Sequence, residues 1–245
     1  MKMEINGAVF IIGSLFWDPN QGDNINLRKN WRRDRLIMKE KIHVKAPIRY
    51  GRLSGKNNDK HYTMIFTKSC DNNNNFGTAY IVPFKKNPIR SIRGLVNQAR
   101  FLSESEGAND KKLCKGKNNK WCTIGLLFNP NIDKKIKSDV LNKWKEILVK
   151  DGGLNDFKDY KISKEKSVLS SNGEILINWP RAVDNKEQQY IDKLDIIIAT
   201  CTKPNLLSYP NVHGLKESLN RDKRKYFYQN LKHGITTFQD RDILN

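Results

Sequence analysis

The segment from residue 43 to residue 84 most constrains the fold, because apolar stretches alternate there with turn-forming residues. The stretches are HVKAPIRYGRLSG (43–55), HYTMIFTK (61–68) and FGTAYIVPF (76–84), separated by GKNND and DNNNN. Such stretches predict β-strands, and the short turns between them favour antiparallel neighbours. Earlier in the chain, VFIIGSLFW (9–17) predicts a buried strand that breaks into a loop at Gly13 and Ser14.

The hydrophobic pattern changes to a helical one after Asn87. Asn87 and Pro88 suit the first turn of a helix, and apolar residues then recur at helical spacing as far as Leu102. Gly107 is placed to end this helix. The rest of the chain predicts a strand at 121–129, a helix at 133–150, a strand near 174–179, a helix near 185–194, a strand at 195–200 and a closing helix at 221–234.

Two glutamates, Glu104 and Glu106, occupy the end of the predicted helix. Residues four apart share a helix face, so Glu106 falls on the apolar face with Leu102, whereas Glu104 points to nearly the opposite side. A carboxylate on an apolar face costs free energy unless it is paired or used. Glu104 is therefore interpreted as a solvated charge. For Glu106 three interpretations stay open: a general acid–base, a structural ion pair with a lysine, or a frayed last turn.

The formal net charge of +19 is the strongest compositional signal in these 245 residues. Lysine and arginine cluster at 28–35, 111–120 and 221–232. Such clusters attract polyanions, so we expect weak, non-specific binding of nucleic acid. The competing interpretation is a general bias toward lysine and asparagine, in which the clusters are solvated faces.

Cysteine and histidine spacing predicts neither a metal site nor a disulfide framework. The residues concerned are Cys70, Cys114, Cys122, Cys201, His43, His61, His213 and His233. The longest apolar runs, AVFIIGSLFW and LDIIIAT, are too short to span a bilayer, and MKMEINGAVFII contains no small-residue cleavage site. We therefore expect a cytoplasmic protein with no membrane partner.

Three segments together resemble the gamma-glutamylcyclotransferase-like family. GAVFIIGSLFW resembles its first strand and Tyr-Gly-Ser loop, FGTAYIVPF resembles a later strand, and LSESEG is similar to the segment whose last glutamate is the family's catalytic residue. The resemblance implies an α+β fold in which residues 1–130 form a small, mostly antiparallel β-barrel with flanking helices. Residues 131–245 would then be an α/β C-terminal extension packed on that core.

The resemblance also implies a reaction and a catalytic residue. The α-amine of a small-molecule gamma-glutamyl amide would attack its own side-chain carbonyl, giving 5-oxoproline and a released amine. Glu106 would carry the proton from the α-ammonium to the leaving amine. No metal or cofactor would be needed.

The loop after the first strand would hold the substrate, because glycine lets backbone N–H groups approach it closely. The residues assigned to substrate binding are Ile12, Gly13, Ser14, Leu15 and Tyr80. Ile12 stands where the family has a tyrosine, and Tyr80 is the candidate to supply the missing hydroxyl. Two alternatives keep the fold as a scaffold: a basic nucleic-acid-binding protein and a catalytically inactive interaction protein.

Overall fold

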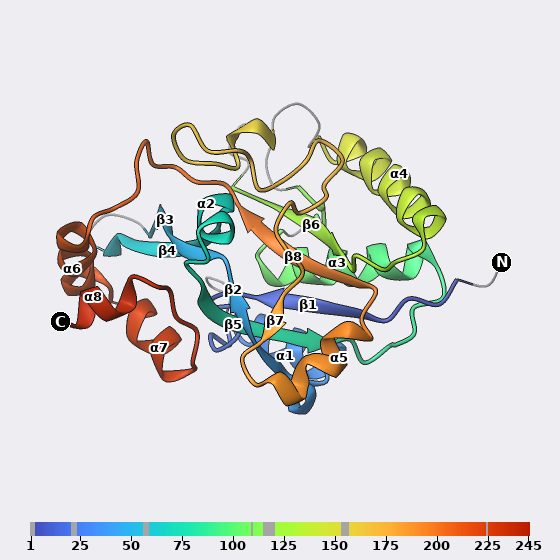
Figure 1. Cartoon of the computed structure of the whole chain (residues 1–245), viewed down its shortest axis with the longest axis horizontal. Helices are drawn as coiled ribbons and strands as arrows, with labels where there is room; N and C mark the ends of the chain where they lie inside the picture. Colours follow the sequence, from blue (N-terminus) through green and yellow to red (C-terminus); the bar gives the residue numbers. More distant parts are fainter. Residues whose placement is uncertain are drawn as a thin grey trace.

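A mixed β-sheet surrounded by helices forms the centre of the molecule (Figure 1). The computed structural model describes residues 3–20, 24–55, 59–108, 110–114, 121–152, 157–223 and 225–245. The strands of this six-stranded sheet are, in spatial order, β6 (Cys122–Phe128), β8 (Ile196–Thr202), β1 (Gly7–Ile11), β5 (Gly77–Pro83), β2 (Ile42–Ala46) and β7 (Arg181–Ala182).

Strands β8 and β1 are neighbouring interior strands of this sheet. They pair in parallel, whereas the other neighbouring strands pair antiparallel. All residues of β1 are buried, and Ile196, Ile197 and Ile198 of β8 are fully inaccessible to solvent. Strands that are buried on both faces read as continuous apolar runs, which explains the pattern seen at 9–17 and 195–200.

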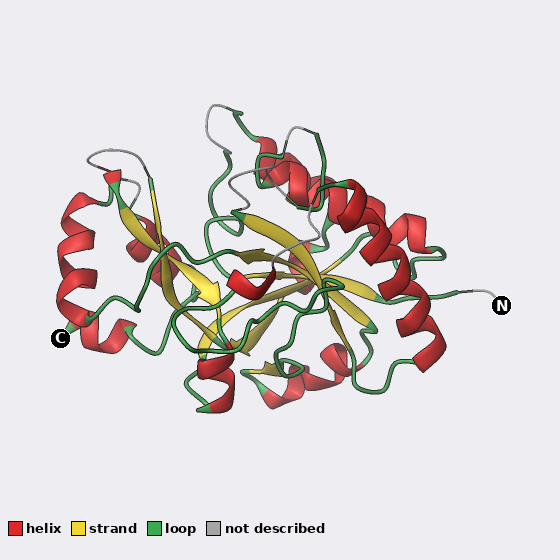
Figure 2. Ribbon diagram, turned by 90° about the horizontal axis from the view of Figure 1, so that it is seen from above, coloured by secondary structure: helices red, strands yellow, loops and turns green. Residues whose placement is uncertain are grey.

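A second, two-stranded ribbon of β3 (Ile48–Ser54) and β4 (His61–Phe66) lies beside the sheet. The segment 43–55, predicted as one strand, therefore divides at Pro47: β2 stays in the large sheet and β3 leaves it. Proline has no N–H to donate to a ladder, so it suits the corner between two sheets. In Figures 1 and 2, the helices near the C-terminus lie beside this ribbon.

The helices cover the sheet and the ribbon. They are α1 (Leu27–Arg35), α2 (Lys68–Asn72), α3 (Ile92–Ser105), α4 (Lys134–Lys150), α5 (Gln188–Asp192), α6 (Val212–Arg221), α7 (Tyr226–Lys232) and α8 (Asp240–Leu244). Short 3-10 turns occur at Met38–Glu40, Phe157–Asp159 and Asn185–Glu187. Among the described residues, every helix is too short or too polar to cross a lipid bilayer.

Helix α3 begins later than predicted. The side chain of Asn87 does not cap it, because its amide bonds both backbone groups of Gly7, at 3.0 Å and 2.9 Å. Ser91 is the N-cap instead, and its Oγ accepts the N–H of Gly94 at 3.1 Å. At the other end the prediction is confirmed: Gly107 follows the helix with a φ of 87°, which suits glycine.

The predicted strand near 174–179 is wrong. Only isolated bridges form there, between Leu126 and Glu174 and between Leu169 and Ile175, so the described backbone is irregular. The predicted closing helix at 221–234 is shorter, since α6 ends at Arg221 and a new helix, α7, starts at Tyr226.

The predicted α+β class agrees with the structure, but the strands of the described residues form no closed barrel. The larger sheet instead ends at β6 and β7, and isolated bridges at Cys114–Thr123 and Leu126–Glu174 cover part of the outer edge of β6. It also crosses the predicted boundary at residue 130, because β8 lies between β6 and β1. Residues 131–245 thus supply a central strand in addition to packing on the first part of the chain.

Candidate active site

A cavity of about 730 Å³ opens where β1 ends. One wall is the loop that follows β1, and the opposite wall is the β3–β4 ribbon with the end of β8. Its lining includes Gly13, Ser14, Leu15, Arg28, Glu106 and Tyr226. Ile12 also lines it, so four of the predicted binding positions and the predicted catalytic glutamate share one cavity.

The loop after β1 folds back on itself. The N–H of Phe16 donates to the carbonyl of Gly13 at 2.9 Å, and the N–H of Asp18 donates to the carbonyl of Ser14 at 2.8 Å. The N–H groups of residues 13–15 themselves donate no hydrogen bond within the described part of the chain. Successive unpaired N–H groups beside a cavity form a ready binding place for an anionic oxygen.

Glu106 lies at the C-cap of α3 and is only 8% exposed. Glu104 is more exposed and pairs with Lys111, Nζ to Oε2, at 3.2 Å. The helix geometry therefore separated the two glutamates correctly. The turn at Glu106 is closed by bonds from its N–H to the carbonyls of Leu102 and Ser103, at 3.1 Å and 3.2 Å, so the last turn is formed and not frayed.

Arg28 is the partner of Glu106, and it joins the loop to the end of α3. Its Nη2 donates to Glu106 Oε2 at 3.0 Å, and its Nε donates to the carbonyl of Ser105 at 3.2 Å. Its Nη1 donates to Ser14 Oγ at 3.1 Å and to Asp18 Oδ2 at 3.3 Å. A cation at a helix C-terminus interacts favourably with the carbonyls there. The Arg28 guanidinium is therefore fixed by its hydrogen bonds to the loop and to the end of α3.

Arg32, one turn further along α1, supports the same loop. It is partly buried and donates from Nη1 to the carbonyls of Leu15 and Asp18. Burial, and next the positive charge of Arg28, lowers the pKa of Arg32 to about 10. Part of the basic cluster 28–35 is therefore internal and holds the loop, which neither interpretation of the net charge anticipated. Residues 115–120 and Arg224, in the other two clusters, lie outside the described residues.

Tyr226, from α7, brings a hydroxyl group to the loop. A Cβ built on Gly13 would lie 2.5 Å from the Tyr226 hydroxyl oxygen, so the two residues are in close contact. The hydroxyl accepts the N–H of Met64 at 3.4 Å. Burial raises the pKa of Tyr226 to about 12, so the phenol is neutral at pH 7 and available as a donor.

Tyr80 does not reach this cavity. Its ring stacks between Phe16, with centroids 4.4 Å apart, and His43, with centroids 5.0 Å apart. It is not among the residues that line the cavity. Tyr80 pairs with Ile11 across the β1–β5 ladder, and its ring packs in this aromatic stack, away from the site. The assignment of Tyr80 to substrate binding is therefore corrected: it is a packed strand aromatic.

Sequence reasoning missed Arg28 and did not assign Tyr226 to the site. The sequence held a weak signal for Arg28, because it lies three residues before Trp31 and so shares a helix face with that aromatic residue. In the structure both residues are buried. For Tyr226 the sequence predicted inward packing, but the neighbour it meets comes from a loop more than two hundred residues earlier.

Comparison of the chain with models of known protein families, with curated proteins and with solved structures finds no match.

Proposed function

We propose that this protein is a gamma-glutamylcyclotransferase-like enzyme that cyclises a gamma-glutamyl amide to 5-oxoproline and releases an amine. The observation that supports this most is the placement of Glu106 and the Gly13–Leu15 loop on one cavity. Two features that were identified separately, one from helix geometry and one from a motif, thus meet at a space large enough for a small molecule. The resemblance also implies a barrel-like core, and the contact between β4 and β8 beside the cavity supports that part of the proposal.

In the proposed reaction Glu106 moves the proton. Arg28 pairs with Glu106 in the structure, and in this proposal the Glu106 carboxylate accepts a proton from the α-ammonium of the substrate. The freed amine then bonds to the gamma-carbonyl carbon and the amide C–N bond breaks, while Glu106 passes the two protons that the α-nitrogen loses, one after the other, to the leaving nitrogen, which departs as an ammonium ion. Atoms and charge balance without an oxidant, a reductant or a water molecule.

Developing negative charge on the carbonyl oxygen needs donors that are already in place. The unpaired N–H groups of residues 13–15 supply them in this proposal, and the neutral hydroxyl of Tyr226 lies beside the same loop. Tyr226 thereby takes the role that the family's tyrosine would have at the position of Ile12. Arg52, on the β3 side of the cavity, adds a positive charge that suits the α-carboxylate of the substrate.

The test is release of 5-oxoproline from a panel of gamma-glutamyl amides by the purified protein. Glu106→Gln should lower turnover by about 10²–10⁴-fold, the usual contribution of a general acid–base, while urea unfolding shows that the protein stays folded. Glu104→Gln is the matched control, because Glu104 lies two residues away and outside the cavity lining. It should leave turnover nearly unchanged.

Equal, mild effects of the two substitutions would remove Glu106 from the reaction. If no gamma-glutamyl amide is turned over and the protein instead binds DNA or RNA tightly and selectively, the alternative of a nucleic-acid-binding protein takes precedence. Nucleic-acid binding and amide turnover can be measured separately. Binding is identified by the fall of its affinity with salt, and turnover by the amount of 5-oxoproline formed.

A further inference from the structure

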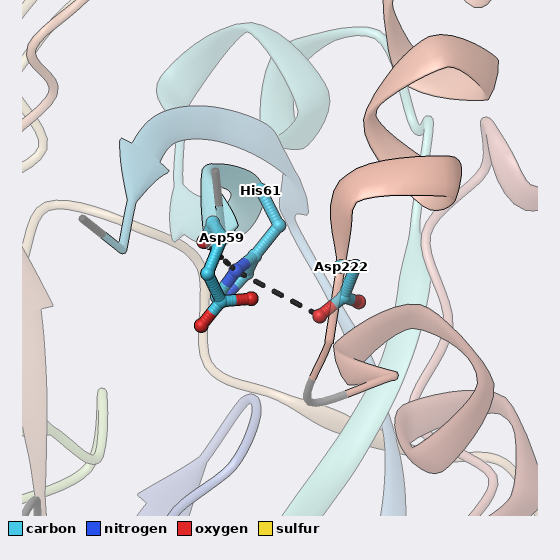
Figure 3. A group of neighbouring side chains, drawn as sticks. All are labelled: Asp59, His61 and Asp222. Atoms are coloured by element: carbon cyan, nitrogen blue, oxygen red, sulfur yellow. Dashed lines mark hydrogen bonds and ion pairs between the residues drawn. The ribbon is translucent and has the colours of Figure 1, made fainter. Parts of the chain in front are cut away.

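Three side chains that the proposed reaction does not use form a compact cluster at the edge of the cavity. Asp59 lies just before β4, His61 is the first residue of β4, and Asp222 follows the end of α6 (Figure 3). One potential ligand atom from each of the three lies within 4.8 Å of the others. Asp59 and His61 also line the cavity, so the cluster has an open side.

Burial makes this cluster unusual. The side chains of His61 and Asp222 are 7% and 4% exposed, and Asp222 Oδ1 has no hydrogen-bond partner among the described residues. A buried carboxylate oxygen without a donor is costly, so such an atom calls for a positive charge that compensates it. In Figure 3 Asp222 and His61 point toward one another.

The distances fit a shared cation better than a hydrogen bond. His61 Nδ1 and Asp222 Oδ1 are 3.7 Å apart, whereas an N–H···O hydrogen bond spans about 2.7–3.2 Å. Two ligands that each lie about 2.0–2.1 Å from a tetrahedral zinc ion are about 3.4 Å apart. His61 Nδ1 also lies 3.1 Å from the carbonyl oxygen of Asp59, to which it donates a hydrogen bond in the tautomer protonated at Nδ1. The tautomer protonated at Nε2 frees Nδ1 as a metal ligand and leaves the carbonyl as a further oxygen on the same side.

The surrounding chain orients each of these groups. Asp59 Oδ1 accepts the N–H of Lys223 at 2.9 Å, and Asp222 Oδ2 accepts the N–H of Phe227 at 3.3 Å. The His61 ring stacks on Tyr226, with centroids 5.5 Å apart. Hydrogen bonds to the second oxygen of a carboxylate and packing of an imidazole are what hold metal ligands in place.

We propose that Asp59, His61 and Asp222 bind one divalent transition-metal cation, with zinc as the preferred ion. One imidazole and two carboxylates are a nitrogen–oxygen set that suits Zn²⁺, and two carboxylates balance its charge. Magnesium and calcium prefer oxygen ligands alone, so the imidazole selects against them. The open side toward the cavity leaves a position for a bound molecule. This site is independent of the proposed cyclotransferase function.

The experiment is calorimetric titration of ZnCl₂ into the full-length protein after treatment with a chelator. We expect one zinc ion per chain, a rise in the unfolding temperature, and much weaker binding of Mg²⁺. His61→Gln and Asp222→Asn should each weaken zinc binding by about 100-fold or more, since changes to supporting residues alone cost about 10–100-fold. Asp59→Asn provides a third variant should one of these fold poorly, as judged by circular dichroism.

The matched control is His213→Gln. His213 and Glu217 form an exposed pair on α6, with Nε2 and Oε1 3.3 Å apart, and test adventitious binding by a histidine–carboxylate pair. Substituted Co²⁺ should give a spectrum without thiolate charge-transfer bands, which excludes the four buried cysteines as ligands. Absence of binding, unchanged binding in the folded His61→Gln and Asp222→Asn variants, or loss of binding in His213→Gln would each overturn the proposal. If no zinc binds, the contact between His61 and Asp222 has a structural role only.

Discussion

At the scale of single residues, the contact between Gly13 and Tyr226 links the two ends of the chain. Gly13 lies in the loop after the first strand, and Tyr226 begins a helix near the C-terminus. The Tyr226 hydroxyl takes up space that a side chain at position 13 would need, since a Cβ there would lie 2.5 Å from its oxygen. Packing against Tyr226 therefore favours glycine at this position of the loop, independently of the proposed approach of a substrate.

Gly13→Ala should destabilise the protein by about 1–3 kcal/mol, the usual cost of overpacking. Tyr226→Phe removes the atom 2.5 Å from the new Cβ and leaves the next one at 3.4 Å, an ordinary contact. The double variant should therefore be more stable than the sum of the single changes predicts, by about 0.5–3 kcal/mol. Urea unfolding of all four proteins measures this coupling. Additive effects would show that the two residues do not share this space.

Sequence alone could identify Glu106 but not its partner. The position of Glu106 on the buried face follows from helical periodicity, which is local information. The identity of the cationic residue that pairs with Glu106 depends on how α1 packs against α3. A local sequence pattern contains no information about that packing. One of the three interpretations left open for Glu106 was an ion pair with a lysine, and the structure has an ion pair with Arg28. The assignment of Tyr80 to substrate binding was wrong for the same reason. A strand pattern does not show which of the two faces of the strand borders a cavity.

At the scale of elements, the end of α3 determines where Glu106 points. Gly107 adopts a φ of 87°, and the helix terminates on it directly after Glu106. The N-cap Ser91, at the opposite end of the same helix, contributes to stability in a comparable way but lies far along the helix from the cavity. Substitutions at the two ends of α3 can therefore distinguish a change in the position of Glu106 from a general loss of stability.

Gly107→Ala should lower stability by about 1–2 kcal/mol, because alanine is strained in the left-handed region. Ser91→Ala should cost a similar amount, about 0.5–2 kcal/mol, through loss of the cap. Only Gly107→Ala should also lower kcat for the gamma-glutamyl amide, since it moves Glu106. Unfolding curves and turnover of the same samples provide both measurements. If both variants keep full turnover, the position of Glu106 does not depend on this turn.

At the scale of the whole molecule, the sheet joins the two halves of the chain. Strand β6 reaches β1 through β8, which comes from the C-terminal half. The sequence did predict a buried strand at 195–200, but not its place between β6 and β1. Pairings between distant segments follow from the packing of the complete chain, and the family resemblance, which fades after residue 130, suggested a division there.

A fragment of residues 1–130 should not fold by itself. It lacks β8, so β1 loses its parallel neighbour and β6 has no strand to pair with in the described sheet. We expect no cooperative unfolding transition of this fragment in urea, whereas the full chain shows one under the same conditions. A fragment with a cooperative transition would show that the first 130 residues are a domain in their own right.

The central place of β8 also affects how the protein is made. A ribosome delivers β1 and β6 long before residues 196–202 emerge, so both strands wait with an open apolar edge. Unpaired edges of this kind recruit other chains, and sheets that depend on distant pairings form slowly. We therefore expect the nascent chain to depend on chaperones more than its modest size suggests, and overexpression at low temperature to favour recovery of folded protein.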